Sequence, residues 1–168
     1  MSFIVGKDGD ISLLRVGVII AVVGILLIGG GIAAFFLDQN TYKAPLEVEP
    51  FPQATPWGKV NETASTRRSV YLVDGASPED VEAYYQQKLQ DLDGQDSTCQ
   101  RLPAVGVMEA SKTDSSVVPY TITCLFQRSG LQASQVTTVK IQPGVFNADP
   151  AMNTQGKTVI EHSERWQP

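Results

Sequence analysis

Three aspartates surround a glycine in the segment 91–96, which reads DLDGQD, and alternating carboxylates beside a glycine are typical of calcium-binding loops. An EF-hand loop needs an oxygen ligand at its fifth position, a glycine at its sixth and an acid at its twelfth. Counted from Asp91, these positions hold Gln95, Asp96 and Leu102, so the spacing is wrong. The cluster predicts a solvated helix end, and we predict no metal site.

His162 is the one histidine of the 168-residue chain, so a metal site built from several of its own histidines is excluded. A serine triad would also have to use His162, but the chain has no G-x-S-x-G nucleophile elbow. The segment 159–165 predicts a terminal strand whose polar side chains face water. Gly29-Gly30-Gly31 lies in an apolar run, and no G-x-G-x-x-G motif or P-loop is present. We therefore predict no catalytic residue and no cofactor.

Cys99 and Cys124 are the two cysteines, and neither lies in a C-x-x-C or C-x-x-C-H motif. Both belong to the part of the chain that we expect outside the cell membrane, where disulfides form. We predict a disulfide between them, with two buried free thiols as the alternative. The bridge closes a loop of roughly 26 residues, which stabilises a fold by about 3.5 kcal/mol on the chain-entropy estimate.

The longest apolar run extends from Val16 to Leu37 without a charged side chain. An α-helix of this length covers roughly 33 Å, enough to cross a hydrocarbon core of about 30 Å. A cleavable signal peptide is the alternative, but its apolar region is shorter, about 7 to 15 residues. We therefore predict a retained membrane-spanning helix over 16–37.

The positive-inside rule sets the orientation of this helix. Lys7 and Arg15 precede it, and only Lys43 follows closely. We therefore expect residues 1–15 to form a cytoplasmic arm and the remainder to lie in the periplasm or beyond the plasma membrane of a bacterium.

Small residues line one face of the predicted span, at Gly17, Ala21, Gly24 and Gly31. Small side chains let helices approach closely in lipid, where packing drives association. Because glycine is common in membrane helices, composition alone is the alternative explanation. We expect this face to pack against the transmembrane helix of another subunit within the lipid bilayer.

The chain after the span is acidic, with eleven Lys and Arg against sixteen Asp and Glu. A negative net charge repels phosphate backbones, and no basic run offsets it. This balance excludes nucleic acid as a partner.

Residues 38–66 contain four prolines in a polar setting, which disfavours a helix and favours extended backbone. We predict a linker that either holds the domain away from the membrane or lies along a partner. Phe51 and Trp57 are candidate anchors on such a partner. Trp57 has an equally good alternative role, which is to cover the core of its own domain.

Residues 67–168 are expected to form the folded domain. Ser77-Pro78-Glu79-Asp80 predicts a capped helix start, and Gly94 predicts its end. Alternation of apolar and polar residues predicts strands elsewhere, two of which should pair antiparallel, 120–126 with 136–142. The expected elements are a strand over 69–74, a helix over 77–94, a short strand at 99–102, and strands over 120–126, 136–142 and 157–164. This β-α-β-β-β-β order predicts an α+β domain with one amphipathic helix on an antiparallel sheet.

The strand followed by the helix from Ser77 to Leu89, and then by a cysteine-containing sheet, resembles small membrane-tethered extracytoplasmic domains of uncharacterised bacterial proteins. The resemblance covers about a hundred residues and implies a fold and a location, with no activity. The layout of one span and a small outer domain is similar to accessory subunits of bacterial respiratory complexes, such as the alternative complex III of quinol oxidation. No residue is carried over from that similarity.

These features predict a non-catalytic single-pass accessory or scaffolding subunit of a bacterial membrane complex, with a respiratory or photosynthetic electron-transport complex as the setting that the resemblance implies. Its expected partners are transmembrane helices and outer surfaces of other membrane subunits. The alternative is a free-standing tethered domain that binds a ligand or an envelope component. That alternative, like an enzyme with paired carboxylates, requires a concave pocket.

Overall fold

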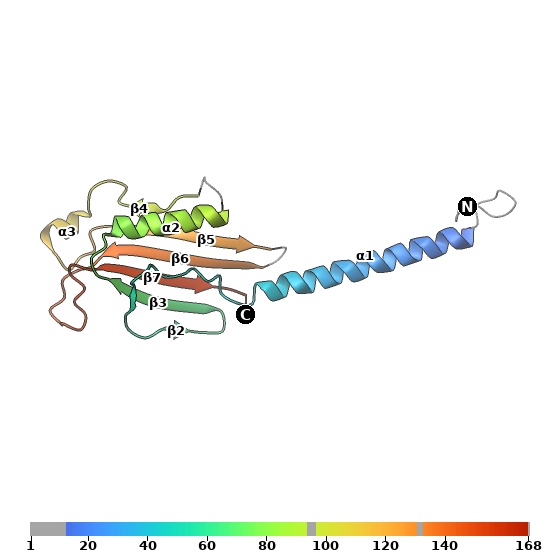
Figure 1. Ribbon diagram of the computed structural model, residues 1–168, viewed down its shortest axis with the longest axis horizontal. Helices are drawn as coiled ribbons and strands as arrows, with labels where there is room; N and C mark the ends of the chain where they lie inside the picture. Colours follow the sequence, from blue (N-terminus) through green and yellow to red (C-terminus); the bar gives the residue numbers. More distant parts are fainter. Residues whose placement is uncertain (1–12, 94–96, 131–132, 168) are drawn as a thin grey trace. The chain divides into compact units, whose positions relative to one another are not determined.

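The computed structural model describes residues 13–93, 97–130 and 133–167, and the chain divides into two compact units that meet between Thr41 and Tyr42 (Figure 1). The first unit contains helix α1 (Leu13–Thr41), and the second contains an antiparallel seven-stranded sheet with two helices. The elements of the second unit are β1 (Thr55–Pro56), β2 (Asn61–Glu62), β3 (Thr66–Val73), α2 (Pro78–Asp93), β4 (Gln100–Leu102), α3 (Glu109–Thr113), β5 (Thr121–Ser129), β6 (Ser134–Pro143) and β7 (Thr158–Arg165). The predicted α+β class is confirmed.

Helix α1 is long and apolar enough to cross a membrane, and none of its most apolar window is buried by the rest of the protein. It therefore is a candidate membrane anchor, although a signal sequence has the same properties. The helix runs past the predicted end at Leu37, and the Thr41 hydroxyl donates to the Leu37 carbonyl at 3.0 Å in its last turn. The predicted cytoplasmic arm lies largely outside the described residues.

The sheet has the strand order β1-β3-β7-β6-β5-β4, with β2 also paired to β3. The predicted antiparallel pair is confirmed, since Ile122 to Ser129 of β5 pair with Ser134 to Ile141 of β6. The C-terminal strand β7 lies between β3 and β6, at the centre of the sheet. One face of β7 is covered, since Thr158, Ile160, His162 and Glu164 are all buried, and this decides the surroundings of its polar side chains.

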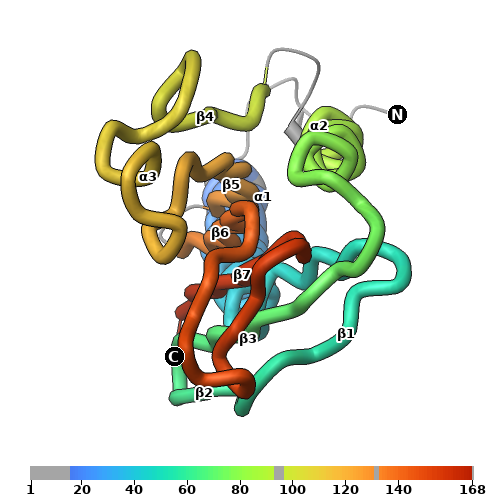
Figure 2. The backbone as a smooth tube through the Cα atoms, turned by 90° about the vertical axis from the view of Figure 1, so that its left-hand side faces the viewer, coloured from blue at the N-terminus to red at the C-terminus, as the bar shows by residue number. Residues whose placement is uncertain are grey.

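One face of the sheet carries the core. Helix α2 lies on this face together with the segment that follows α1, as Figure 2 shows in a view along the strands. The start of α2 is capped as predicted, because the Ser77 hydroxyl accepts the Asp80 N–H at 3.1 Å and the Asp80 carboxylate accepts the Ser77 N–H at 3.0 Å. The fully enclosed part of the core consists of Val73, Val81, Tyr85, Leu89, Ile122, Cys124, Phe126, Val139, Ile141 and Ile160.

Residues 42–54, which we call the strap, belong to the folded unit, although the sequence predicts a linker over 38–66. Tyr42 is buried, and Leu46 joins the core cluster. The prolines exclude a helix here, but extended backbone is well suited to lie along a sheet. The folded unit therefore begins well before the predicted boundary at Arg67.

A disulfide joins Cys99 to Cys124, with an S–S distance of 1.97 Å, and this confirms the predicted pairing. The two residues are direct neighbours across β4 and β5, one position beyond the pair Gln100 and Thr123. The bridge therefore closes the excursion that contains β4 and α3.

Candidate functional site

The strap crosses the sheet with alternating side chains. Leu46 and Val48 point toward the core, whereas Glu47 and Glu49 are largely exposed. Cavities lie on both sides of residues 47–49, one toward α2 and one toward β3 and β7. Concave features of this kind are where proteins commonly bind small ligands.

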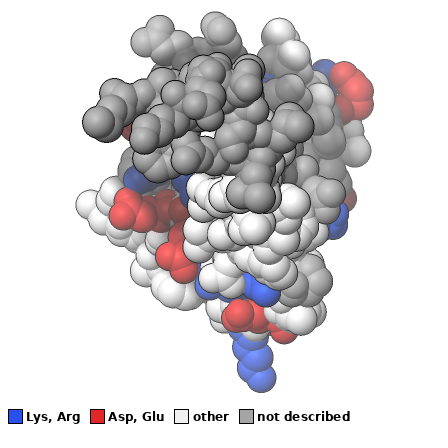
Figure 3. All heavy atoms as spheres, turned by 90° about the vertical axis from the view of Figure 1, so that its right-hand side faces the viewer, with Lys and Arg blue, Asp and Glu red and all other residues white. Residues whose placement is uncertain are grey.

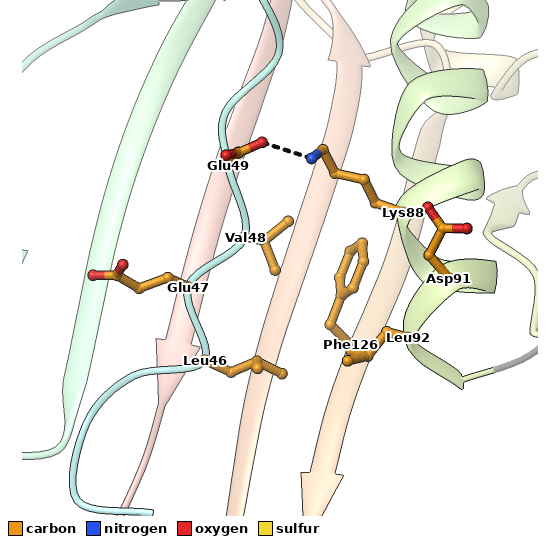
Figure 4. A pocket seen from close by; sticks show the side chains of 8 residues that line it. All are labelled: Leu46, Glu47, Val48, Glu49, Lys88, Asp91, Leu92 and Phe126. Atoms are coloured by element: carbon orange, nitrogen blue, oxygen red, sulfur yellow. Dashed lines mark hydrogen bonds and ion pairs between the residues drawn. The ribbon is translucent and has the colours of Figure 1, made fainter.

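The cavity toward α2 is an open groove of about 400 Å³ (Figure 4). Leu46, Val48 and the Phe126 ring point into it from the strap and the sheet, and Leu92 closes it from α2. Lys88 reaches across one end to Glu49, with 2.7 Å between its Nζ and the carboxylate. This hydrogen bond lowers the pKa of Glu49 and raises the pKa of Lys88. The groove therefore has an apolar floor and a charged bridge at one end.

The cavity toward β3 and β7 has a volume of about 230 Å³, and several charged side chains line it. The Arg67 Nε donates to the Glu164 carboxylate at 2.6 Å, and Glu164 is only 4 % exposed. Glu47 lies 3.8 Å from the same guanidinium, on the strap side. The hydrogen bond to Glu164 raises the pKa of Arg67, so the cation is permanent and balances the buried carboxylate.

His162 and Tyr85 form the centre of the buried network. The Tyr85 hydroxyl accepts the Phe51 N–H at 3.0 Å and lies 2.9 Å from the His162 Nε2. The direction of this second bond depends on the tautomer: Nε2 accepts from the hydroxyl when the imidazole proton lies on Nδ1, and donates to it when the proton lies on Nε2. Burial, with a further contribution from Arg67, lowers the pKa of His162 to about 4, so the ring is neutral at pH 7.

This network holds the strap on the sheet. Beyond the Phe51 link, the Thr137 hydroxyl donates to the Leu46 carbonyl at 2.6 Å, and the Gln135 amide donates to the Ala44 carbonyl at 2.6 Å. The imidazole Nε2 is occupied by Tyr85, so His162 has a structural partner where a general base would need a substrate. The polar residues of this cavity bind one another, whereas the groove beside α2 leaves apolar surface open.

This network is not predictable from the sequence pattern. The pattern predicts polar side chains of 159–165 facing water, and this is wrong for His162 and Glu164, which are 1 % and 4 % exposed. Both residues share the alternation of Ile160, so they face the covered side of a strand that the topology places at the sheet centre. The available signal was that Ile160, His162 and Glu164 are alternate residues and so share one face of the strand. Only the position of β7 in the fold shows that this face is covered.

Phe51 and Trp57, the predicted interface anchors, contact their own domain. The Phe51 ring packs edge-on against Tyr84, with 5.4 Å between centroids. Trp57 is half-buried, its backbone N–H donates to the Val70 carbonyl at 2.8 Å, and its side chain lines a third cavity of about 430 Å³. This cavity lies on the other side of β3, where Arg68 and Met152 also line it.

The remaining predicted site residues are distributed as follows. A Cβ added at Gly17, Gly24 or Gly31 meets nothing within 4 Å among the described residues, and Ala21 is exposed. The small-residue face of α1 is therefore open in this chain. Asp91 lies in the last turn of α2 and lines the groove, whereas Gln95 and Asp96 lie outside the described residues.

Charges of the described residues do not form a large patch of one sign on the face drawn in Figure 3, where basic and acidic side chains are interspersed. Within the described ranges, no group of three or more His, Cys, Asp or Glu side chains is placed to hold a metal ion. No family model, no curated protein and no solved structure matches the chain.

Proposed function

We propose that this chain is a non-catalytic, single-pass accessory or scaffolding subunit of a bacterial membrane complex. In this proposal α1 is a retained anchor with its N-terminus in the cytoplasm, and the domain lies on the outer side of the plasma membrane. The disulfide between Cys99 and Cys124 supports an extracytoplasmic domain.

The observation that carries the proposal is that no flexible linker separates helix α1 from the folded unit in the described part of the chain. Helix α1 ends at Thr41, and the folded unit begins at the next residue. The polar last turn, Asp38 to Thr41, adds only about 6 Å beyond the apolar run. The Tyr42 carbonyl already accepts the Gln167 N–H at 3.1 Å, so the first residue of the domain is hydrogen-bonded to the segment that directly follows its last strand.

A domain connected in this way stays at the membrane surface. A long flexible linker lets a domain search for soluble ligands at a distance, because its reach grows with its length. Here residues 42–54 are part of the fold, so they do not serve as a long linker with which the domain could reach partners far from the membrane. This geometry suits permanent contact with another subunit that protrudes from the bilayer.

The electron-transport setting rests on the layout alone, which is similar to that of accessory subunits of respiratory complexes. The strap adds little to a partner contact, because Leu46, Val48 and Phe51 pack on their own domain. A specific interface needs about 1,000 Å². In this proposal the area comes from the small-residue face of α1 and from exposed surface of the domain.

Purification from native membranes in mild detergent tests the proposal. We expect other membrane subunits to co-elute with the chain in fixed stoichiometry, and redox subunits among them if the complex transports electrons. A monomer that elutes alone from several mild detergents contradicts the proposal.

A free-standing tethered binding domain is the second candidate, and the groove of Figure 4 favours it. The volume of about 400 Å³ lies within the usual range of ligand sites. Native mass spectrometry of the purified chain supports this candidate if a bound small molecule is present, if Val48→Asp removes it, and if the exposed control Val60→Asp retains it.

A further inference from the structure

The loop from Leu102 to Met108, which we call the 102–108 loop, exposes a run of apolar side chains. The exposed fractions are 64 % for Leu102, 88 % for Val105, 38 % for Val107 and 45 % for Met108. Single exposed apolar residues are normal on protein surfaces, but several in one short loop mark an interaction site. The segment reads LPAVGVM and contains no charged side chain.

The loop has a fixed shape, and Arg101 sets it. The Arg101 guanidinium donates to the Pro103 carbonyl at 2.7 Å and to the Gly106 carbonyl at 2.9 Å. Gly106 has a φ of 78°, a conformation that favours glycine, directly after the most exposed residue. At its far end the loop is closed by the Met108 N–H, which donates to the Pro119 carbonyl at 2.8 Å.

The arginine is itself held by the domain. Its guanidinium carbon lies 4.0 Å from the centroid of the Tyr120 ring, and the Tyr120 hydroxyl donates to Glu79 at 2.6 Å in the first turn of α2. Burial and this hydrogen bond raise the pKa of Tyr120 to about 12, so the hydroxyl keeps its proton. The 102–108 loop is thereby connected to the sheet and to α2.

A rigid apolar loop is well suited to docking, because it loses little conformational entropy when it binds. The loop is unsuited to an anionic membrane surface, since it has no basic residue and no Trp or Tyr at its tip. The flanking Lys112 is paired with Glu109 at 2.7 Å. Its chemistry therefore fits an uncharged, apolar recess on a protein.

The position of the loop in the domain also defines the partner. Leu102 pairs with Thr121 at the start of β5, whereas the strap enters beside Gln135, opposite the end of β5. A nine-residue strand spans about 30 Å, so loop and entry point lie at opposite ends of the sheet. A partner that contacts both the loop and the strap entry at Ala44 must extend along the length of the sheet.

We propose that the 102–108 loop docks, with Val105 at its centre, into an apolar recess on the outer domain of a neighbouring membrane subunit. This inference rests on the proposed function, because it names the surface by which an accessory subunit holds its partner. The uncharged loop supplies the anchor, and Arg101 is the positioning residue that presents it.

Site-specific photo-crosslinking in native membranes tests the contact. A photoreactive amino acid replaces Val105 in the full-length chain, and Val60, which is 56 % exposed beside β2, provides the matched control. We expect position 105, and not position 60, to crosslink to a subunit that also co-purifies with the unmodified chain. A crosslink to lipid, a crosslink to a second copy of this chain, equal crosslinking from both positions, or none from position 105 overturns the proposal.

Variants separate this inference from the proposed function. We expect Val105→Asp to reduce the co-purified subunit at least about tenfold, as expected of an interface anchor, while Val60→Asp leaves it unchanged. Arg101→Met should reduce it as well, because the loop loses its two carbonyl contacts. If the unmodified chain co-purifies with no subunit, the proposed function fails. If the unmodified chain does co-purify with a subunit, and Val105→Asp retains that subunit, only the role of the loop fails.

Discussion

The Tyr85 hydroxyl connects three parts of the domain that are far apart in the sequence. It belongs to α2, accepts from the strap at Phe51, and meets β7 at His162. Each contact satisfies a polar group that would otherwise be buried without a partner, and such groups are costly. The Tyr85 hydroxyl therefore helps to hold the strap against α2 and β7.

Tyr85→Phe should lower the free energy of unfolding by about 1–3 kcal/mol, because the Phe51 N–H and the His162 Nε2 both lose their partner. Tyr84→Phe is the matched control, since the Tyr84 hydroxyl is near the surface and donates to Pro50 at 3.3 Å. Its expected cost is below about 0.5 kcal/mol. Urea unfolding of the full-length chain in detergent measures both, and equal losses contradict the assigned role of Tyr85.

His162 should make stability depend on pH below neutrality. Its pKa is about 4 in the fold and returns to its ordinary 6.5 on unfolding, so the unfolded chain binds the extra proton between these values. Stability is therefore fully present above pH 6.5 and declines as the pH falls toward 4. The free energy of unfolding should fall by up to about 3 kcal/mol across this window. Urea unfolding midpoints at several pH values measure this loss.

His162→Gln provides the comparison for this pH dependence. The variant is less stable at pH 7, but it lacks the titrating ring, so its stability should change much less between pH 6.5 and 4.5. Asp80 and Asp114, whose pKa values are lowered by hydrogen bonds from serines, affect both proteins equally. Parallel pH profiles for the two proteins would show that His162 is not the responsible group.

At the scale of elements, the strands and the long helix of the domain are predictable because their signals are local. The cap at Ser77 and the alternation through 120–126 and 136–142 depend on neighbours in the sequence. The strap is different, because Leu46 and Val48 are covered only by packing against α2 and β6, which are distant in the sequence. The short elements β1, β2 and α3 carry no periodic pattern and are not predicted.

Less of the candidate site than of the fold could be predicted from the sequence. His162 and Arg67 lie close together only because β7 inserts beside β3, and this pairing joins residues almost a hundred positions apart. The 102–108 loop gives a further example. Its apolar composition is visible in the sequence, but apolar residues alone do not distinguish an exposed loop from a core segment.

The small-residue face of α1 leads to a prediction at this scale. Replacing Gly24 or Gly31 with Leu should reduce the partner that co-purifies, because close approach of two helix backbones is lost. Conservative changes at the large residues Ile20 and Leu27, Ile20→Leu and Leu27→Ile, should have less effect, because they add no bulk to the helix surface. The measurement is the amount of partner per chain in mild detergent, and an unchanged ratio for both glycine variants would assign the packing to another face.

At the scale of the whole molecule, the orientation of α1 determines which compartment the domain occupies. We expect the domain outside, because Lys7 and Arg15 precede the span. Protease added to spheroplasts should then degrade a C-terminal epitope tag while sparing an N-terminal one. The reverse pattern would place the domain in the cytoplasm, and it would also make the disulfide unexpected.

The bridge between Cys99 and Cys124 has a consequence for survival in a compartment that contains proteases. Both β4 and the 102–108 loop lie between the two sulfurs, so a break in the backbone there leaves the two fragments covalently joined. A protease that cuts beside Val105, after small apolar residues, should give a single species on a non-reducing gel and two fragments after reduction. Fragments that separate without a reductant would show that the bridge is not formed. The exposed 102–108 loop can thus be clipped without separating the C-terminal strands from the rest of the chain.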